Sequence, residues 1–104
     1  MIDNCENDEE FPHVENIHAR LLEAISEYDS ELDMNAWHRC ETTHCRAGWA
    51  VHLAGDAGYL LEDRVGTLFA AMQIYRVSGY KISPVRFFES AKLAMQDIER
   101  LANC

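Results

Sequence analysis

The sequence is short of basic side chains: it holds nine Lys and Arg against eighteen Asp and Glu, and its formal net charge is -9. The shortage is confined to one part of the chain. Residues 1–35 contain eleven acidic side chains and one basic, Arg20, whereas residues 36–104 contain seven acidic and eight basic. An acidic block of this kind repels nucleic acid and attracts basic molecules. We therefore expect no direct binding of DNA or RNA, and a basic protein as the partner.

Long apolar runs are also missing. No stretch approaches the roughly 18 apolar residues of a membrane helix. The first ten residues, MIDNCENDEE, are acidic where a signal peptide is basic and then apolar. These features predict a cytoplasmic protein with no membrane contact. The four cysteines, Cys5, Cys40, Cys45 and Cys104, are then expected to stay thiols in a reducing compartment.

Recognisable catalytic motifs are absent as well. The sequence has no glycine-rich phosphate loop, no Ser-His-Asp order and no paired-carboxylate motif, so we expect neither an enzyme nor a cofactor. The one nucleophile considered is Cys45, because a thiol in the first turn of a helix beside His44 could have a lowered pKa. Nothing in the sequence specifies the base or the oxyanion pocket that such a nucleophile needs.

Strand-like alternation of apolar and polar residues is missing beyond a few positions, whereas helical spacing recurs along the chain. The sequence predicts an acidic flexible tail over residues 1–11 and one compact all-α domain of four to six short helices over residues 12–104. Helices are expected over residues 12–28, 44–54, 56–66, 68–78 and 91–101, with a single turn after Pro84.

Helix ends can be predicted from the residues that cap them. Thr42 or Thr43 is expected to cap the second helix, and Thr67 and Ser90 are expected to cap later ones. Gly55 is expected to end the second helix in a left-handed conformation.

Aromatic residues and one glycine give predictions about packing. Trp37 and Trp49 are expected in the core, whereas one of the adjacent Phe87 and Phe88 is expected to be exposed. Gly48 in a helix interior costs about 1 kcal/mol relative to alanine, which predicts a close approach there by another helix or the Trp37 ring.

The first helix is predicted to be two-sided. Its inward stripe comprises Val14, Ile17, His18, Leu21, Leu22 and Ile25, at i, i+3, i+4 spacing. Carboxylates project on the opposite side and continue into the following turn. The predicted partner-binding residues are Glu15, Glu23, Glu27, Asp29, Glu31 and Asp33. The alternative is a solvated face that only keeps the protein soluble. Elsewhere Glu62, Asp63, Lys92, Asp97, Glu99 and Arg100 are expected to face solvent.

A metal site is the competing interpretation of residues 37–52. A tetrahedral zinc site would use Cys40 and Cys45 with two of His38, His44 and His52. The ligand types fit, but the Cys-x4-Cys spacing and the adjacency of His44 and Cys45 do not match common zinc motifs. The other interpretation makes the cysteines small buried side chains and the histidines hydrogen-bonding groups.

The segments TTHCRAGWAVHLAGDAGYLLE, AAMQIYR and SPVRFF carry a resemblance. Over about residues 34–102 the chain resembles a group of short, uncharacterised proteins associated with bacteriophages and prophages, which share a Cys-x-x-Thr-His-Cys-x-Ala-Gly-Trp core. The resemblance implies a phage context and no catalytic residues. The acidic lead-in lies outside it.

Phage context and a one-sided acidic face together suggest a function. A row of carboxylates can imitate the phosphates that a basic nucleic-acid channel binds. The sequence therefore predicts an inhibitor or modulator that binds a basic groove of a host nucleic-acid-handling or defence protein, with an anti-CRISPR protein as its most specific form. The alternative function is a small structural zinc-binding helical domain.

Overall fold

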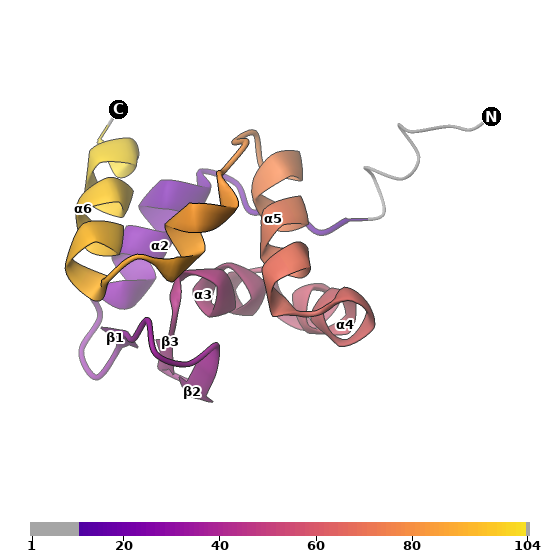
Figure 1. Ribbon diagram of the computed structural model, residues 1–104, viewed down its shortest axis with the longest axis horizontal. Coiled ribbons are helices and arrows are strands. Elements are labelled where there is room, and N and C mark those ends of the chain that lie inside the picture. The colour runs from indigo at the N-terminus through magenta and orange to yellow at the C-terminus, as the bar shows by residue number, and fades with distance from the viewer. Residues whose placement is uncertain (1–10, 104) are drawn as a thin grey trace.

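The computed structural model describes residues 11–103, which form five α-helices, one 3-10 helix and a small sheet (Figure 1). The elements are α2 (Ile17–Ile25), β1 (Glu31–Leu32), β2 (His38–Cys40), β3 (Thr43–His44), α3 (Arg46–Leu53), α4 (Gly55–Val65), α5 (Thr67–Val77), η1 (Pro84–Phe88) and α6 (Ala91–Ala102). The domain is largely helical, but the sheet corrects the all-α prediction. Of the tail expected over residues 1–11, only Phe11 is described. Within this described part, no helix has the length and apolar character of a membrane span.

The sheet consists of three very short strands in the order β1-β3-β2. β1 pairs with β3 in parallel, with Leu32 opposite His44. β2 pairs with β3 in antiparallel, and the register is irregular between His38 and Cys40. Strands of two or three residues are too short to show the alternation by which strands are predicted. The sheet holds residues 31–45 against the start of α3.

Helix α2 is shorter than predicted, because it begins after Asn16 rather than near Pro12. Asn16 has a φ of 52°, a left-handed conformation that does not continue a right-handed helix. The predicted apolar stripe is confirmed by the burial of Val14, Ile17, Leu21 and Ile25. Glu23 and Glu27 are exposed on the other side.

Two of the predicted helix caps are wrong and one is confirmed. Cys45 caps α3, where its Sγ accepts a hydrogen bond from the Gly48 N–H at 3.3 Å; Thr42 and Thr43 lie before it. Gly66 is the N-cap of α5, and the Thr67 hydroxyl donates instead to Glu62 at 2.7 Å. Ser90 does cap α6, since its hydroxyl accepts from the Leu93 N–H. Gly55 has the predicted positive φ, 73°, but opens α4 directly after α3.

Gly48 has the packing role that its position predicted, although the neighbour is a backbone group and not the Trp37 ring. A Cβ on Gly48 would lie 1.8 Å from the carbonyl oxygen of Trp37. This carbonyl accepts a hydrogen bond from the Cys45 N–H at 3.2 Å, so the β1–β2 connection is fastened to the start of α3. The absence of a side chain at Gly48 therefore positions Trp37.

The aromatic residues divide between core and surface. Trp49 is buried as predicted, and its indole N–H donates to the Glu31 carbonyl at 2.9 Å. Trp37 is 40% exposed, so its assignment to the core was wrong. Phe87 is buried and Phe88 is 66% exposed, which confirms that only one of the pair faces inward.

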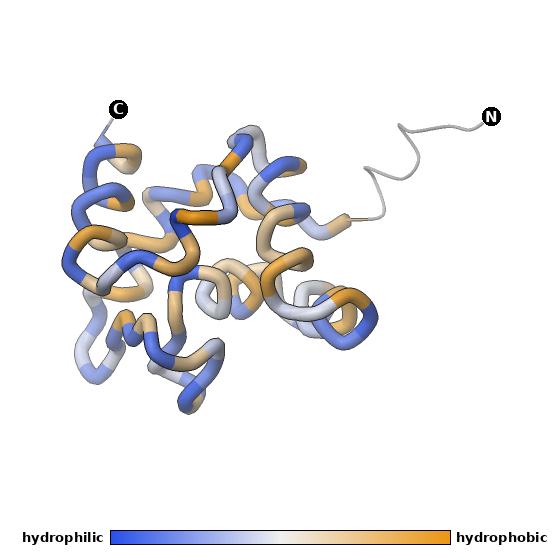
Figure 2. Tube along the Cα trace, in the orientation of Figure 1, coloured by the Kyte–Doolittle hydropathy of each residue, from blue (hydrophilic) through white to orange (hydrophobic). Residues whose placement is uncertain are grey.

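The helices pack in two groups around α3. Helices α2 and α6 lie side by side at one end of the domain, whereas α4 and α5 lie at the other, and α3 contacts α2, α4 and α5 (Figure 1). Hydrophilic and hydrophobic residues alternate around α6, as expected for a helix with one packed face (Figure 2). Helices that are far apart in the sequence thus pack around one hydrophobic core.

A charged pair lies inside this core, against the expectation that Asp97 faces solvent. Arg46, whose side chain is 0% exposed, donates through Nη1 to Asp97 Oδ2 at 2.9 Å and through Nε to the hydroxyl of the buried Tyr75 at 2.9 Å. Arg46 Nη2 and the Nε2 of His18, nearby on α2, are buried without a hydrogen-bond partner among residues 11–103. Burial lowers the pKa of His18 to about 4, so this imidazole is neutral at pH 7. The hydrogen bonds of Arg46 thus link α3 to α5 through Tyr75 and to α6 through Asp97.

Candidate functional site

The six predicted partner-binding carboxylates do not all line one hollow. Glu23 and Glu27 line a hollow of about 300 Å³, together with Arg20, Glu41, Thr42 and His52. We call this the acidic hollow. Glu41 was not among the predicted residues, and the β2–β3 turn brings it to α2. No residue described between positions 11 and 103 forms an ion pair with Glu23, Glu27 or Glu41.

The other four predicted carboxylates lie elsewhere. Glu31 and Asp33 line a second hollow with Glu89. Asp33 accepts hydrogen bonds from the Asn35 N–H at 3.0 Å and from Arg39 Nε at 2.8 Å, and these two donors lower its pKa. Glu15 precedes α2 and contacts His13 at 3.4 Å, while Asp29 is exposed after α2. Neither of these two residues lines the acidic hollow.

Histidines from the sheet form a hydrogen-bonded chain with α4. His38 and His44 share a hydrogen bond between their Nδ1 atoms at 2.8 Å, and His44 Nε2 donates to the Glu41 carbonyl at 2.9 Å. His38 Nε2 lies 2.6 Å from Glu62 Oε2, which also accepts the Thr67 hydroxyl. The lowered pKa of His44 favours its neutral form, which donates through Nε2 and accepts at Nδ1 from the His38 Nδ1–H. The chain ties β2 and β3 to α4 and is a structural bridge.

Glu62 was predicted to be solvated, and this prediction is wrong. Its side chain is only 18% exposed, because it faces His38 and Thr67. No spacing rule joins residues 38 and 62, so the sequence carries no signal for the contact. Next to this chain the His44 ring stacks on His52 with centroids 4.6 Å apart. Burial is the main reason why the pKa of His44 lies below its ordinary value.

The five residues of the zinc hypothesis do not converge on one point. Cys40 is exposed and contacts the Thr42 hydroxyl, Cys45 caps α3, and His52 shares a hydrogen bond with Tyr59 at 2.8 Å. Among the described residues, no three His, Cys, Asp or Glu side chains are grouped so as to hold a metal ion. The structure thus does not assemble the expected ligand set, and zinc binding stays a hypothesis for direct metal analysis.

The pKa values of the two described cysteines are shifted in opposite directions. The sequence analysis considered Cys45 as the thiol with a lowered pKa, but in the structure that thiol is Cys40. Burial raises the pKa of Cys45, and hydrogen bonds from the Gly48 and Ala47 N–H groups only partly offset it. His44 is adjacent in sequence, but its nitrogens bond His38 and the Glu41 carbonyl instead. Cys40 is exposed, and hydrogen bonds from the Thr42 N–H and from the Thr42 and Thr43 hydroxyls lower its pKa.

Alkylation is therefore expected at Cys40 and not at Cys45 in the folded protein. With Cys5 and Cys104 replaced by serine, iodoacetamide at neutral pH should modify one thiol quickly and the second only after unfolding in urea, because thiolate character and exposure control the rate. Peptide mass spectrometry identifies the modified residue, and Cys40→Ser is the control. Rapid labelling of Cys45 in the native state would contradict this assignment and reopen the nucleophile hypothesis.

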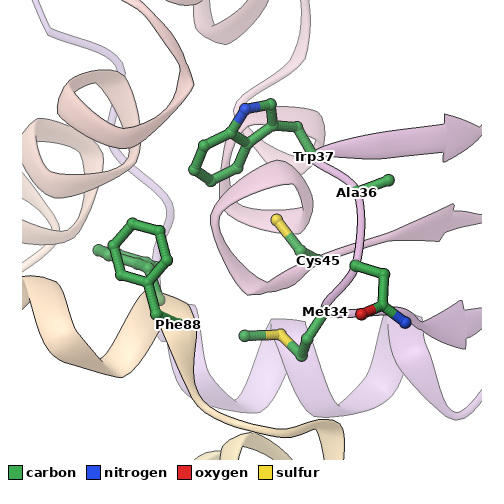
Figure 3. A pocket seen from close by; sticks show the side chains of 7 residues that line it. Met34, Ala36, Trp37, Cys45 and Phe88 are labelled. Atoms are coloured by element: carbon green, nitrogen blue, oxygen red, sulfur yellow. The ribbon is translucent and has the colours of Figure 1, made fainter.

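A groove that the sequence analysis missed lies between residues 31–37 and residues 87–91. Its apolar end, a hollow of about 290 Å³, is lined by Met34, Ala36, Trp37, Cys45, Phe87 and Phe88 (Figure 3). Its polar end, about 570 Å³, is lined by Glu31, Leu32, Asp33, Glu89, Ser90 and Ala91. Met34, Asn35 and Phe88 line both ends, so the two hollows adjoin. We call the whole feature the aromatic groove.

No protein-family model, curated protein or solved structure matches this chain. The resemblance of residues 34–102 to phage-associated proteins stays a prediction that rests on its motif. The described surface has two hollows that a partner could enter, the acidic hollow and the aromatic groove.

Proposed function

We propose that this protein is an interaction module that binds a basic surface of a partner protein through the acidic hollow. The observation that carries the proposal is the grouping of Glu23, Glu27 and Glu41, which are exposed and have no ion pair among the described residues. Three carboxylates around one hollow outnumber its one cationic side chain, Arg20, so the local potential is negative and steers basic partners. The net charge of -9 adds to this attraction.

A basic groove that binds nucleic acid is the partner surface of matching chemistry, because its arginines and lysines already accept a row of negative charges. Occupying such a groove excludes its nucleic acid, so the module would act as an inhibitor or modulator without being an enzyme. The phage resemblance suggests a host nucleic-acid-handling or defence protein in the cytoplasm, and an anti-CRISPR activity is one form of this proposal. The module itself makes no direct contact with nucleic acid.

Reversing two charges in the hollow is expected to abolish partner binding. In a pull-down from the native host, Glu23→Lys with Glu27→Lys should lose a partner that the wild type retains at low salt, because like charges across an interface are strongly unfavourable. With the purified partner, the Kd should rise by about 10- to 100-fold. Raising the salt to about 0.5 M should weaken wild-type binding, because exposed charges are screened.

Asp63→Lys with Glu99→Lys is the matched control, because it changes the net charge equally at exposed positions on α4 and α6. Circular dichroism should show all three proteins folded. Retention of the partner by the Glu23 and Glu27 double variant, or its loss by both double variants alike, would refute the acidic hollow as the contact surface.

A further inference from the structure

The aromatic groove exposes two large rings at its apolar end. Phe88 is 66% exposed, and its ring lies edge-on to that of Trp37, with centroids 6.3 Å apart. In Figure 3 these rings and Met34 surround the hollow, and the Cys45 side chain lies between them. Exposed aromatic side chains around a hollow are typical of the positions that contribute most to protein interfaces.

The size of the apolar end limits what can enter it. About 290 Å³ is at the lower limit of the range of small-molecule pockets. The lining is mostly carbon and sulfur, with Asn35 as the one polar side chain. One large apolar side chain suits this space better than a cofactor.

The polar end of the groove is lined by the carboxylates of Glu31, Asp33 and Glu89. Arg86 donates to Glu89 Oε2 and Arg39 donates to Asp33 Oδ2, each at 2.8 Å, and Glu89 Oε1 is buried without a hydrogen-bond partner in the described part of the chain. Glu31 is exposed, and within residues 11–103 it forms no ion pair. A cationic side chain next to the apolar end would meet the exposed carboxylate of Glu31.

We propose that the aromatic groove binds an extended basic segment of a partner protein. An apolar side chain of that segment enters between Trp37 and Phe88, and a neighbouring lysine or arginine pairs with Glu31. This inference rests on the proposed function. It adds a buried apolar contact, which a purely ionic interface lacks. Charge complementarity argues against a second copy of this chain, because each copy carries a charge of -9. It argues equally against the acidic segment that precedes residue 11.

The first test is a titration of the ¹⁵N-labelled full chain with two capped hexapeptides, each built of one leucine and five lysines, with the leucine at opposite ends. We expect millimolar binding by at least one peptide, with the largest shifts at the Trp37 indole N–H and at the amides of Phe88 and Glu89. A peptide with alanine for leucine and one with glutamates for lysines are the controls. Shifts outside the groove, or equal binding of either control, would overturn the proposal.

Phe88→Ala is the decisive variant, and Phe69→Ala is its matched control. Both rings are largely exposed, but Phe69 is on α5 and lines no part of the groove. Phe88→Ala should weaken peptide binding by at least about tenfold, whereas Phe69→Ala should leave it unchanged. Glu31→Gln should weaken the binding of the lysine peptides. The difference in affinity between a leucine peptide and its alanine control should stay the same. Equal effects of the two phenylalanine variants would overturn the assignment.

The same variants separate this proposal from the proposed function when the host partner is in hand. Loss of that partner with Phe88→Ala as well as with the Glu23 and Glu27 double variant supports both. Loss with the double variant alone keeps the acidic hollow and overturns the groove. Loss with Phe88→Ala alone keeps the groove and overturns the hollow. A dimer in analytical ultracentrifugation that Phe88→Ala dissociates would overturn the basic-partner assignment in favour of self-association.

Discussion

Replacing Asp97 by alanine is expected to lower the free energy of unfolding by about 3–5 kcal/mol, which is typical when one partner of a buried ion pair is removed. Arg46 would keep its charge in a site where its side chain is 0% exposed. Its Nη2 already lacks a hydrogen-bond partner within the described residues, and the substitution would orphan Nη1 as well. Urea denaturation measures the loss, and Glu99→Ala on the exposed side of the same helix should change stability by less than about 1 kcal/mol.

Acid should remove the stabilisation that the Asp97 carboxylate provides. Burial alone would raise the pKa of Asp97, but hydrogen bonds from Arg46 and Arg100 outweigh it, so the pKa lies below its ordinary value. The stabilisation is therefore complete above the pKa of an unfolded aspartate and is lost as the pH falls through the lowered folded value. The stabilities of wild type and Asp97→Ala should converge in strong acid. An Asp97→Ala variant within 1 kcal/mol of wild type at pH 7 would show that Arg46 finds another partner.

Gly48→Ala is expected to destabilise the protein, although the same change in an ordinary helix stabilises it by about 1 kcal/mol. The new methyl group would lie 1.8 Å from the Trp37 carbonyl oxygen and 2.9 Å from its carbon. These are backbone atoms, and moving them breaks the hydrogen bond from the Cys45 N–H to that oxygen. We expect a loss of about 3 kcal/mol, at the upper end of the cost of overpacking.

Ala57→Gly, at an exposed position of α4, is the control for Gly48→Ala, because it reports the ordinary difference in helix propensity of about 1 kcal/mol. Thermal unfolding of both variants compares the two effects. In Gly48→Ala, shifts of the Trp37 indole N–H should also show that the wall of the aromatic groove has moved. A Gly48→Ala variant as stable as wild type would mean that the Trp37 backbone can move away without lowering the free energy of unfolding.

The parts of the fold that could be predicted from sequence are those set by local spacing. Helix α6 begins at the predicted cap, Ser90, and the buried and exposed positions of α2 follow the predicted stripe. Phe87 and Phe88 were separated correctly because adjacent residues on a helical turn point about 100–120° apart. Each of these inferences depends on neighbours within four residues.

The parts that could not be predicted depend on contacts between distant residues. Asp97 has charged neighbours on α6, so the sequence predicts that it is exposed. In the structure it is buried against Arg46 of α3, which is 51 positions away in the sequence. Trp37 was assigned to the core, but it lies in the connection between β1 and β2 and lines the aromatic groove. The carboxylates could be counted from the sequence, but only the fold joins Glu41 to Glu23 and Glu27.

The pair of Arg46 and Asp97 also bears on how the chain folds as it is made. A ribosome releases the chain from its N-terminal side, so Arg46 leaves the exit tunnel well before Asp97 does. Until α6 has emerged, the arginine has no counter-charge in the interior, and α2 has no helix to pack against. The contact between Arg46 and Asp97 can therefore form only after α6 has emerged.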